Sequence, residues 1–262
     1  MTYRAVSLDF WFTAIFHPPE GDARYRDERI EFLQENLRRQ NGIPLEAREI
    51  AQAMETVHAR LFTEGKDPIE VDPLPLARAY AEILQARLVL PPEEFGRAFS
   101  AAGLSSRPPS INPECPALIS SLEARKIPVI AITNSARRGS TWQEYLRSNF
   151  GVRFSHVVSS CDVGHAKPHR AIFEEAARRL GLPLGAILHV GDRLELDVEG
   201  ARGAGCGAVL YTGLWGQYPT GMYPPTDLEP VRRSGTPCVE RLDDLLTSDL
   251  LPGPTGGRLP GA

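Results

Sequence analysis

Four short apolar segments of this sequence are each followed by polar side chains of types that occur in active sites. In chain order these side chains are Asp9, Thr133 with Asn134, Lys167, and Asp192 with Asp197. A carboxylate buried without a partner costs several kcal/mol, so Asp9, at the end of the apolar run 5–8, needs a partner if it is buried.

Each of these residues taken alone has an ordinary structural explanation. Asp9 and Thr133 could each cap a turn or a helix, Lys167 could be a solvated surface charge, and Gly191-Asp192 is a common turn. Their combination is much harder to explain as structure, because the carboxyl ends of parallel strands line one crevice of a sheet. We therefore expect the polar groups to meet in a single site.

The strands and helices that must position these polar residues are predicted from an alternation of apolar runs with helical patterns. Short apolar runs rich in β-branched residues are typical of strands covered on both faces, and they occupy 5–8, 128–133, 156–160, 186–190 and 207–211. Helical patterns between them cover about 113–125, 140–149, 169–181 and 194–204. This order predicts βαβ units, and hence an α/β fold with a three-layer, Rossmann-like parallel-sheet core.

Residues 17–110 interrupt the alternation with helical patterns only. The predicted helices run from Asp22 to Arg39, from Pro44 to about 62, over about 75–88, and from Pro92 onward. We expect this segment to be an all-helical inserted domain, linked through Pro-rich stretches to a core domain formed by 1–16 and 111–250. A closing helix at 242–251 and a flexible tail at 251–262 complete the prediction.

Composition narrows the function class. The 262 residues carry a net charge of −4 and no basic run longer than two arginines, which argues against a nucleic-acid partner. No apolar stretch approaches the roughly 20 residues that span a bilayer, and no signal peptide is evident. The four cysteines form no CxxC pair, as expected for free thiols in a reducing compartment. We therefore expect a cytoplasmic protein without a membrane partner.

Together the motifs resemble those of the haloacid dehalogenase-like hydrolase superfamily, over about residues 5–250. That family combines an acid-x-acid-Gly-Thr loop, a Ser or Thr after the second strand, a lysine, and Gly-Asp followed by a further acid. The corresponding residues here are Asp9…Thr13, Thr133-Asn134, Lys167-Pro168 and Gly191-Asp192…Asp197. The most specific stretch is KPHRAIFEEAARRLGLPLGAILHVGDRLELDVEGARGAG, and the predicted helical insertion is similar to the family's first class of cap domain.

The resemblance implies a nucleophile and a metal site. Asp9 would attack phosphorus and form an aspartyl-phosphate, which splits one difficult step into two. Mg²⁺, a hard cation that is held by few carboxylates, would be bound by Asp9, Asp192 and the backbone carbonyl of Trp11. Asp197 belongs to the same metal site by resemblance and would orient it.

The resemblance also implies how the phosphate is held. Thr133 and the backbone amide of Asn134 would bind phosphoryl oxygens. Lys167 would neutralise both the phosphate and the nucleophile. We therefore expect a Mg²⁺-dependent phosphatase whose partner is a small phosphorylated metabolite.

Position 11 departs from the family pattern, because Trp11 replaces the second acid and Phe12 replaces the glycine after it. That acid normally protonates the leaving group and later activates water, and an indole does neither. Three alternatives stay open: a 2-haloacid dehalogenase-like hydrolase, a phosphonate-cleaving enzyme that would use Lys66, and a catalytically impaired binding protein. The retained Asp192, a metal-binding acid, favours the phosphatase.

The sequence indicates little about substrate specificity. His17, Arg24 and Arg26 follow the Asp9 loop closely and are candidates to face the substrate, although an exposed charged helix start explains them as well. We interpret Trp142 and Trp215 as packing residues rather than substrate platforms.

Overall fold

The computed structural model describes residues 3–16, 22–63, 73–102, 109–217, 228–233 and 235–252. Its core is a six-stranded sheet in the order β10-β9-β8-β1-β6-β7, in which all neighbouring strands run parallel. The strands are β1 (Ala5–Asp9), β6 (Val129–Thr133), β7 (Val157–Ser159), β8 (Ile187–Gly191), β9 (Gly207–Tyr211) and β10 (Cys238–Val239). The five strands predicted from the apolar runs are confirmed, and β10 is an edge strand that the sequence analysis missed.

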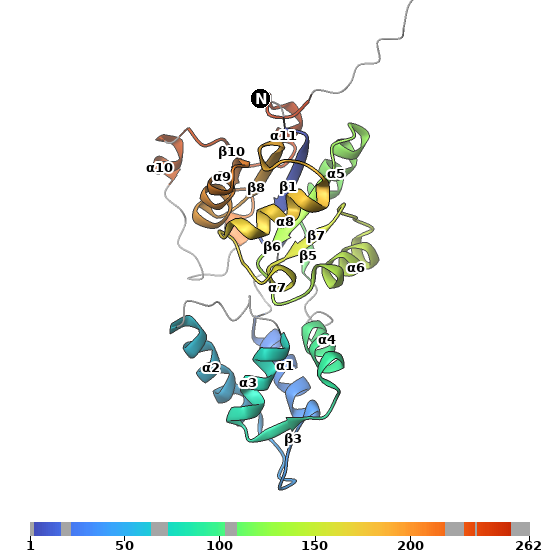
Figure 1. Ribbon diagram of the computed structural model, residues 1–262, viewed down its shortest axis with the longest axis vertical. Helices are drawn as coiled ribbons and strands as arrows, with labels where there is room; N and C mark the ends of the chain where they lie inside the picture. The colour runs from blue at the N-terminus through green and yellow to red at the C-terminus, as the bar shows by residue number, and fades with distance from the viewer. Residues whose placement is uncertain are drawn as a thin grey trace, which may run out of the picture.

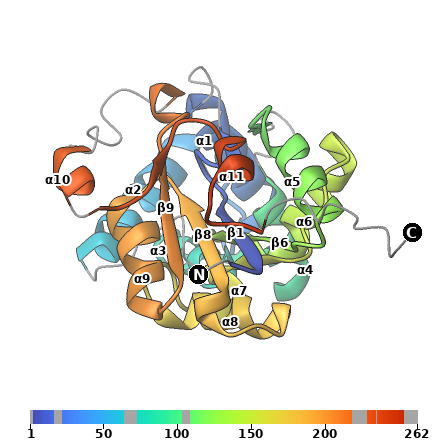
Figure 2. The same cartoon turned by 90° about the horizontal axis from the view of Figure 1, so that it is seen from above.

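Helices cover both faces of this sheet, which confirms the three-layer prediction. On one face pack α5 (Cys115–Ala124), α6 (Gly139–Phe150) and α11 (Asp244–Thr247). On the other pack α8 (Arg170–Leu180), α9 (Gly200–Ala204) and α10 (Leu228–Arg233), while the short α7 (Ser160–Val163) follows β7. Figure 2 shows α8 and α9 on one side of the sheet and α5 and α11 on the other.

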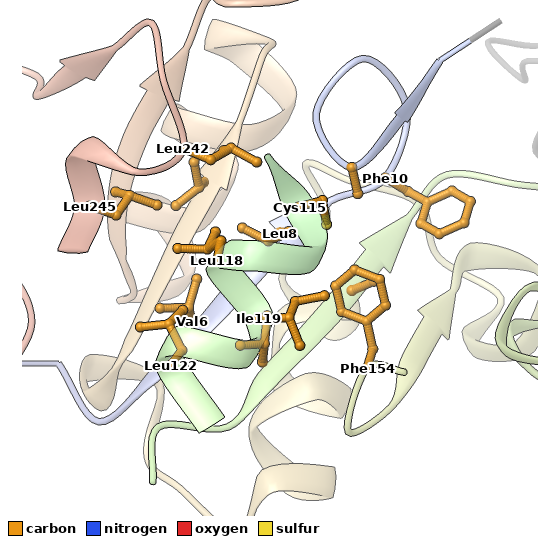
Figure 3. Close-up of a cluster of buried hydrophobic side chains, with 14 of the residues drawn as sticks. Val6, Leu8, Phe10, Cys115, Leu118, Ile119, Leu122, Phe154, Leu242 and Leu245 are labelled. Carbon is orange, nitrogen blue, oxygen red and sulfur yellow. The ribbon is translucent and has the colours of Figure 1, made fainter. Parts of the chain in front are cut away.

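Side-chain alternation along the strands builds two separate apolar cores. In β1, Val6 and Leu8 belong to the cluster under α5, whereas Ala5 belongs to the cluster under α8. Figure 3 shows Leu118 and Leu122 of α5 lying close to the side chains of Val6 and Leu8. Because successive residues of a strand point to opposite faces, the continuous apolar run serves both cores at once.

A group of four helices lies at the end of the molecule opposite the N-terminus (Figure 1). It comprises α1 (Asp22–Asn36), α2 (Ala47–Thr63), α3 (Pro73–Ile83) and α4 (Pro92–Ala101), and we call it the helical unit. The unit has its own apolar core, in which Leu33, Ile50, Tyr80, Phe95 and Phe99 are fully buried.

The expectation that this segment is all-helical was wrong. The predicted helices at 22–39 and 75–88 end early, and their last residues form β3 (Leu37–Arg39) and β4 (Ala86–Leu88). These strands pair antiparallel, with Leu37 opposite Leu88. Leu37 is buried, as a core residue of a helix would be, and hydrophobic periodicity alone could not reveal a pairing between segments about fifty residues apart. The predicted closing helix is likewise shorter and consists of α11 alone.

The two chain segments that connect the core with the helical unit run side by side. They form a small antiparallel ribbon of β2 (Ile15–Phe16) and β5 (Ser110–Ile111). Asn112 anchors the ribbon, because its side-chain amide donates to the carbonyl oxygen of Thr13 at 2.8 Å. The predicted boundary after residue 16 directly follows β2, and the predicted boundary between residues 110 and 111 falls within β5. His17, Lys66 and most of the predicted tail lie outside the described residues.

Among the helices that the structure describes, none combines the length and the apolar character needed to cross a membrane.

Candidate active site

The polar residues singled out from the sequence come together where β8, β1 and β6 end. These three strands are adjacent in the sheet. Asp9 ends β1, Thr133 ends β6 and Asp192 directly follows β8, while Asp197 lies in the helical turns after it. All of them, and Lys167 as well, are at least nine-tenths buried. The structure thus gathers five polar side chains from distant parts of the chain into one buried cluster.

The Lys167 ammonium group lies between two of the carboxylates. It donates to Oδ1 of Asp9, and to Oδ1 of Asp197 at 2.6 Å. Burial alone would lower the pKa of Lys167, but the charges of Asp197 and Asp9 raise it above its ordinary value. Lys167 is therefore a permanently charged cation at neutral pH.

The third carboxylate of the cluster, Asp192, forms no ion pair with any of the described residues. Asp9, Asp192 and Asp197 each offer an oxygen, and these oxygens lie within 4.8 Å of one another. Oδ2 of Asp192 is buried and lacks a hydrogen-bond partner among the residues that the structure describes. Burial, and then the charge of Asp9, raises the pKa of Asp192 well above its ordinary value. Burial raises the pKa of Asp9 too, despite the opposing charge of Lys167.

The charges of this cluster do not balance. Three carboxylates and one ammonium group leave two negative charges in a buried volume, which is costly unless a proton or a cation compensates them. Carboxylate oxygens are the ligands that hard divalent cations such as Mg²⁺ prefer. The orphaned oxygen of Asp192 and its neighbour Asp9 therefore fit a divalent cation.

Asp197 differs from Asp192 in that both of its oxygens are already engaged. Oδ1 accepts from Lys167 and lies 3.2 Å from Nε2 of His189, and Oδ2 accepts from the backbone N–H of Arg193 at 2.9 Å. Burial alone would raise the pKa of Asp197, but the charge of Lys167 and the hydrogen bonds from His189 and Lys167 together lower it below its ordinary value. These contacts suit an acid that orients Lys167 rather than one that is free to bind a metal ion.

The segment that holds Asp197 is wound as a π-helix, Leu194–Glu199, which continues into α9. The sequence analysis predicted a helix over 194–204 and could not foresee the wider winding, which is often found at functional sites. Gly191 lets this segment approach the strand end, because a Cβ atom there would lie 2.3 Å from Cγ of Asp197.

Thr133 and Asn134 lie on the other side of β1. The Thr133 hydroxyl is buried and has no hydrogen-bond partner in the part of the chain that the structure describes, so it is available to a ligand. The Asn134 side chain clamps the lysine loop instead, since its Oδ1 accepts from the Lys167 N–H at 2.7 Å and its Nδ2 donates to the Lys167 carbonyl at 3.0 Å.

The departure from the family pattern at position 11 has a packing explanation. The Trp11 ring packs edge-on against Phe10 and Trp142, with centroid distances of 6.0 and 5.4 Å. Phe12 adopts a left-handed backbone with φ of 58°, the conformation that the family's glycine would adopt freely. For a residue with a side chain, this left-handed conformation costs about 1–2 kcal/mol. The loop therefore retains the turn of the family's glycine although position 12 is a phenylalanine.

The other residues considered from the sequence fall into different surroundings. Arg26 is exposed and forms an ion pair with Glu55 of α2 at 2.5 Å, while nothing is described of the Arg24 side chain. Trp142 is fully buried, as expected of a packing residue. Trp215 is half-buried, and its Nε1–H donates to the Asp192 carbonyl at 3.3 Å.

Sequence reasoning missed two members of the cluster, Ser7 and His189. Both are completely buried, and the Ser7 hydroxyl lies 2.8 Å from Nδ1 of His189. The available signal was a polar residue in the middle of each of two strongly apolar runs.

Comparison with known proteins agrees with this fold and cluster. The family model for haloacid dehalogenase-like hydrolases matches residues 19–205, so the chain belongs to the haloacid dehalogenase-like hydrolase family. The match includes Thr133, Lys167, Asp192 and Asp197 and begins after the Asp9–Thr13 loop.

Curated relatives match shorter segments. The glyceraldehyde 3-phosphate phosphatase of Methanopyrus kandleri is 44% identical over 64 residues, which cover 24% of this chain and 28% of the relative. The 5-amino-6-(5-phospho-D-ribitylamino)uracil phosphatase of Escherichia coli is 39% identical over 82 residues, covering 31% and 32%. The chain thus spans about a third or less of the length of these relatives.

Solved structures match over nearly the whole chain. A HAD phosphatase from Thermococcus onnurineus has a TM-score of 0.57 at 18% identity, covering 94% of this chain and 97% of its own. A 2-haloacid dehalogenase from Pseudomonas syringae has a TM-score of 0.58 at 19% identity, covering 93% and 96%. At such identities these similarities show a shared fold.

The close approach at Gly191 gives a first prediction. Gly191→Ala places a Cβ atom against Asp197, which must then move away from Lys167. We expect a loss of about 1–3 kcal/mol in the free energy of unfolding, measured by urea denaturation. Gly203→Ala in α9 is the control, because a Cβ atom there meets nothing within 4 Å and should be neutral or stabilising. Equal effects of the two substitutions would contradict the packing argument.

Proposed function

We propose that the protein is a Mg²⁺-dependent phosphatase of small phosphorylated metabolites, and that Asp9 is its nucleophile. The observation that carries this proposal is the unbalanced buried cluster. Lys167 is bound to Asp9, and the unpartnered Oδ2 belongs to Asp192. A divalent cation and a phosphate group together would satisfy the charges and the unpaired atoms that the cluster leaves open.

Asp9, Asp192 and the backbone carbonyl of Trp11 would hold the metal ion. When bound, Mg²⁺ would neutralise the negative charge of the phosphate and of the nearby carboxylates. Asp197 contributes indirectly in this proposal, because its oxygens are held by Lys167, His189 and the Arg193 N–H.

The chain's own residues then divide the chemistry. A carboxylate oxygen of Asp9 attacks phosphorus, the bond to the leaving oxygen breaks, and water later hydrolyses the aspartyl-phosphate to regenerate Asp9. Lys167 favours the ionised form of Asp9 and would stabilise the negative charge that develops on the phosphoryl group. The Thr133 hydroxyl, which has no hydrogen-bond partner among the described residues, and the Asn134 backbone N–H would bind phosphoryl oxygens.

The helical unit would act as a cap that supplies substrate specificity. One contact supports this role: the Arg137 guanidinium, on the loop after β6, donates to the carbonyl of Ala102 at the end of α4 at 3.1 Å. The loop that follows Thr133 and Asn134 is thereby tied to the helical unit.

The family's dehalogenase activity is the second candidate. A structural neighbour with this fold is a 2-haloacid dehalogenase. In this chain Trp11 stands in place of the family's second acid, and the departure of a halide ion does not need that acid. The unpartnered Asp192 oxygen favours the phosphatase. A panel of alkyl, aryl and acyl phosphates and 2-haloacids, assayed with Mg²⁺ and with chelator, separates the two. Halide release that persists in chelator, without phosphate release, would refute our proposal.

Asp9→Asn tests the nucleophile. The amide has the same shape but lacks the attacking charge, so we expect kcat for phosphate release to fall by roughly 10⁴-fold or more. Circular dichroism should remain unchanged. Asp27→Asn, at an exposed acid of α1, is the matched control and should retain full turnover. Turnover retained by Asp9→Asn would place the catalytic centre elsewhere.

The absence of an acid at position 11 predicts that the enzyme prefers substrates with good leaving groups. Without a general acid, alkyl phosphates should react more slowly than aryl or acyl phosphates by roughly 10²- to 10⁴-fold. Two of the curated relatives are named for alkyl phosphates, glyceraldehyde 3-phosphate and 5-amino-6-(5-phospho-D-ribitylamino)uracil, so alkyl phosphates belong in the test. Trp11→Asp combined with Phe12→Gly should raise the turnover of alkyl phosphates more than that of aryl phosphates.

Phe12→Gly alone is the control for that double variant. It relaxes the left-handed backbone at position 12 without supplying an acid, so the leaving-group preference should not change. A wild type that hydrolyses alkyl and aryl phosphates equally fast, together with a double variant that gains nothing, would show that another group supplies the proton.

A further inference from the structure

Ser7 and His189 form a polar pair inside the sheet, beneath the catalytic cluster. They lie opposite each other on the neighbouring strands β1 and β8, and neither is exposed. His189 also contacts Phe173 of α8 edge-to-face, with a centroid distance of 5.3 Å. Burying two polar groups costs free energy unless each is hydrogen-bonded, so their partners indicate what the pair does.

The hydrogen bonds run in one direction from Ser7 to the cluster. Nδ1 of His189 lies 2.8 Å from the Ser7 hydroxyl, and Nε2 lies 3.2 Å from Oδ1 of Asp197. An ionised carboxylate only accepts hydrogen bonds, so Nε2 must carry the proton. In a neutral ring Nδ1 is then an acceptor, and the Ser7 hydroxyl donates to it.

The same Asp197 oxygen accepts from the Lys167 ammonium group at 2.6 Å. Oδ2 is held by the Arg193 N–H at 2.9 Å. Three donors thus fix the rotation of the carboxylate, and His189 is the one that comes from the sheet itself. Lys167 in turn donates to Asp9.

We propose that His189 is a positioning residue, held by the Ser7 hydroxyl as the Nε2–H tautomer, which fixes Asp197 and through it the contact of Lys167 with Asp9. The effect on turnover rests on the phosphatase function proposed above, whereas the tautomer and its hydrogen bonds do not. Partners of this kind, one bond removed from the reacting groups, typically change activity by about 10- to 100-fold when they are lost.

The first test reads the ring directly, in metal-free protein without substrate. Long-range proton–nitrogen NMR of nitrogen-15 histidine-labelled protein near neutral pH reports which ring nitrogen carries a proton. The chain has six histidines, and the set of signals missing in His189→Gln identifies His189. We expect protonated Nε2 and unprotonated Nδ1, with an Nδ1 signal that shifts in Ser7→Ala. A proton on Nδ1, or an unshifted signal in Ser7→Ala, would overturn the proposal.

The second test compares two substitutions that both keep the position buried. His189→Met fills the space without a donor, while His189→Gln keeps an N–H near the position of Nε2. We expect His189→Met to lower kcat on an aryl phosphate about 10- to 100-fold with little change in KM, and His189→Gln to recover most of that loss. The exposed His156, replaced by Gln, serves as the neutral control.

Equal losses in His189→Met and His189→Gln, with unchanged thermal unfolding, would mean that the hydrogen bond to Asp197 does not matter for turnover and would overturn the positioning role. If the wild type shows no phosphatase activity, the proposed function fails, and the NMR result still decides the hydrogen-bond arrangement. The two failures are therefore distinguishable.

Discussion

The rest of the site depends on the ion pairs that the buried ammonium group of Lys167 forms with Asp9 and Asp197. The positive charge of this group favours the ionised forms of Asp9 and Asp197, which lie side by side in the interior, and without it their mutual repulsion and desolvation would be uncompensated. The surrounding structure serves to hold this group in place. Asn134 clamps both backbone polar groups of Lys167, and Gly200 leaves room for the adjoining Pro168, whose Cα would lie 2.9 Å from a Cβ atom at that position.

In the loop after β1, a packing residue occupies a position at which the family pattern has an acid. In the family pattern the residue two places after the nucleophile is an acid, and here its space is taken up by an indole packed on Phe10 and Trp142. The Trp142 ring is itself covered by the Arg137 guanidinium at 5.3 Å, and Arg137 reaches the helical unit. At position 11 an aromatic side chain thus stands where the family pattern has an acid, in a region that links the site to the helical unit.

Much of the fold was predictable because the strands of a buried parallel sheet are continuous apolar runs, and polar residues at their ends stand out. Asp9, Thr133 and Asp192 were found in this way. Ser7 and His189 were not, because their meaning depends on the register that brings β1 beside β8. The pairing of β3 with β4 and the π-helical winding around Asp197 also depend on contacts distant in sequence, which periodicity does not encode.

Calorimetric titration of the metal-free protein with Mg²⁺ tests the central claim most directly, since that claim is that the buried cluster is completed by a divalent cation. The account predicts one Mg²⁺ bound per chain, with an affinity that Asp192→Asn weakens by at least about tenfold and Asp27→Asn leaves unchanged. Absence of binding to the folded wild type, or equal affinity in the wild type and Asp192→Asn, would contradict it.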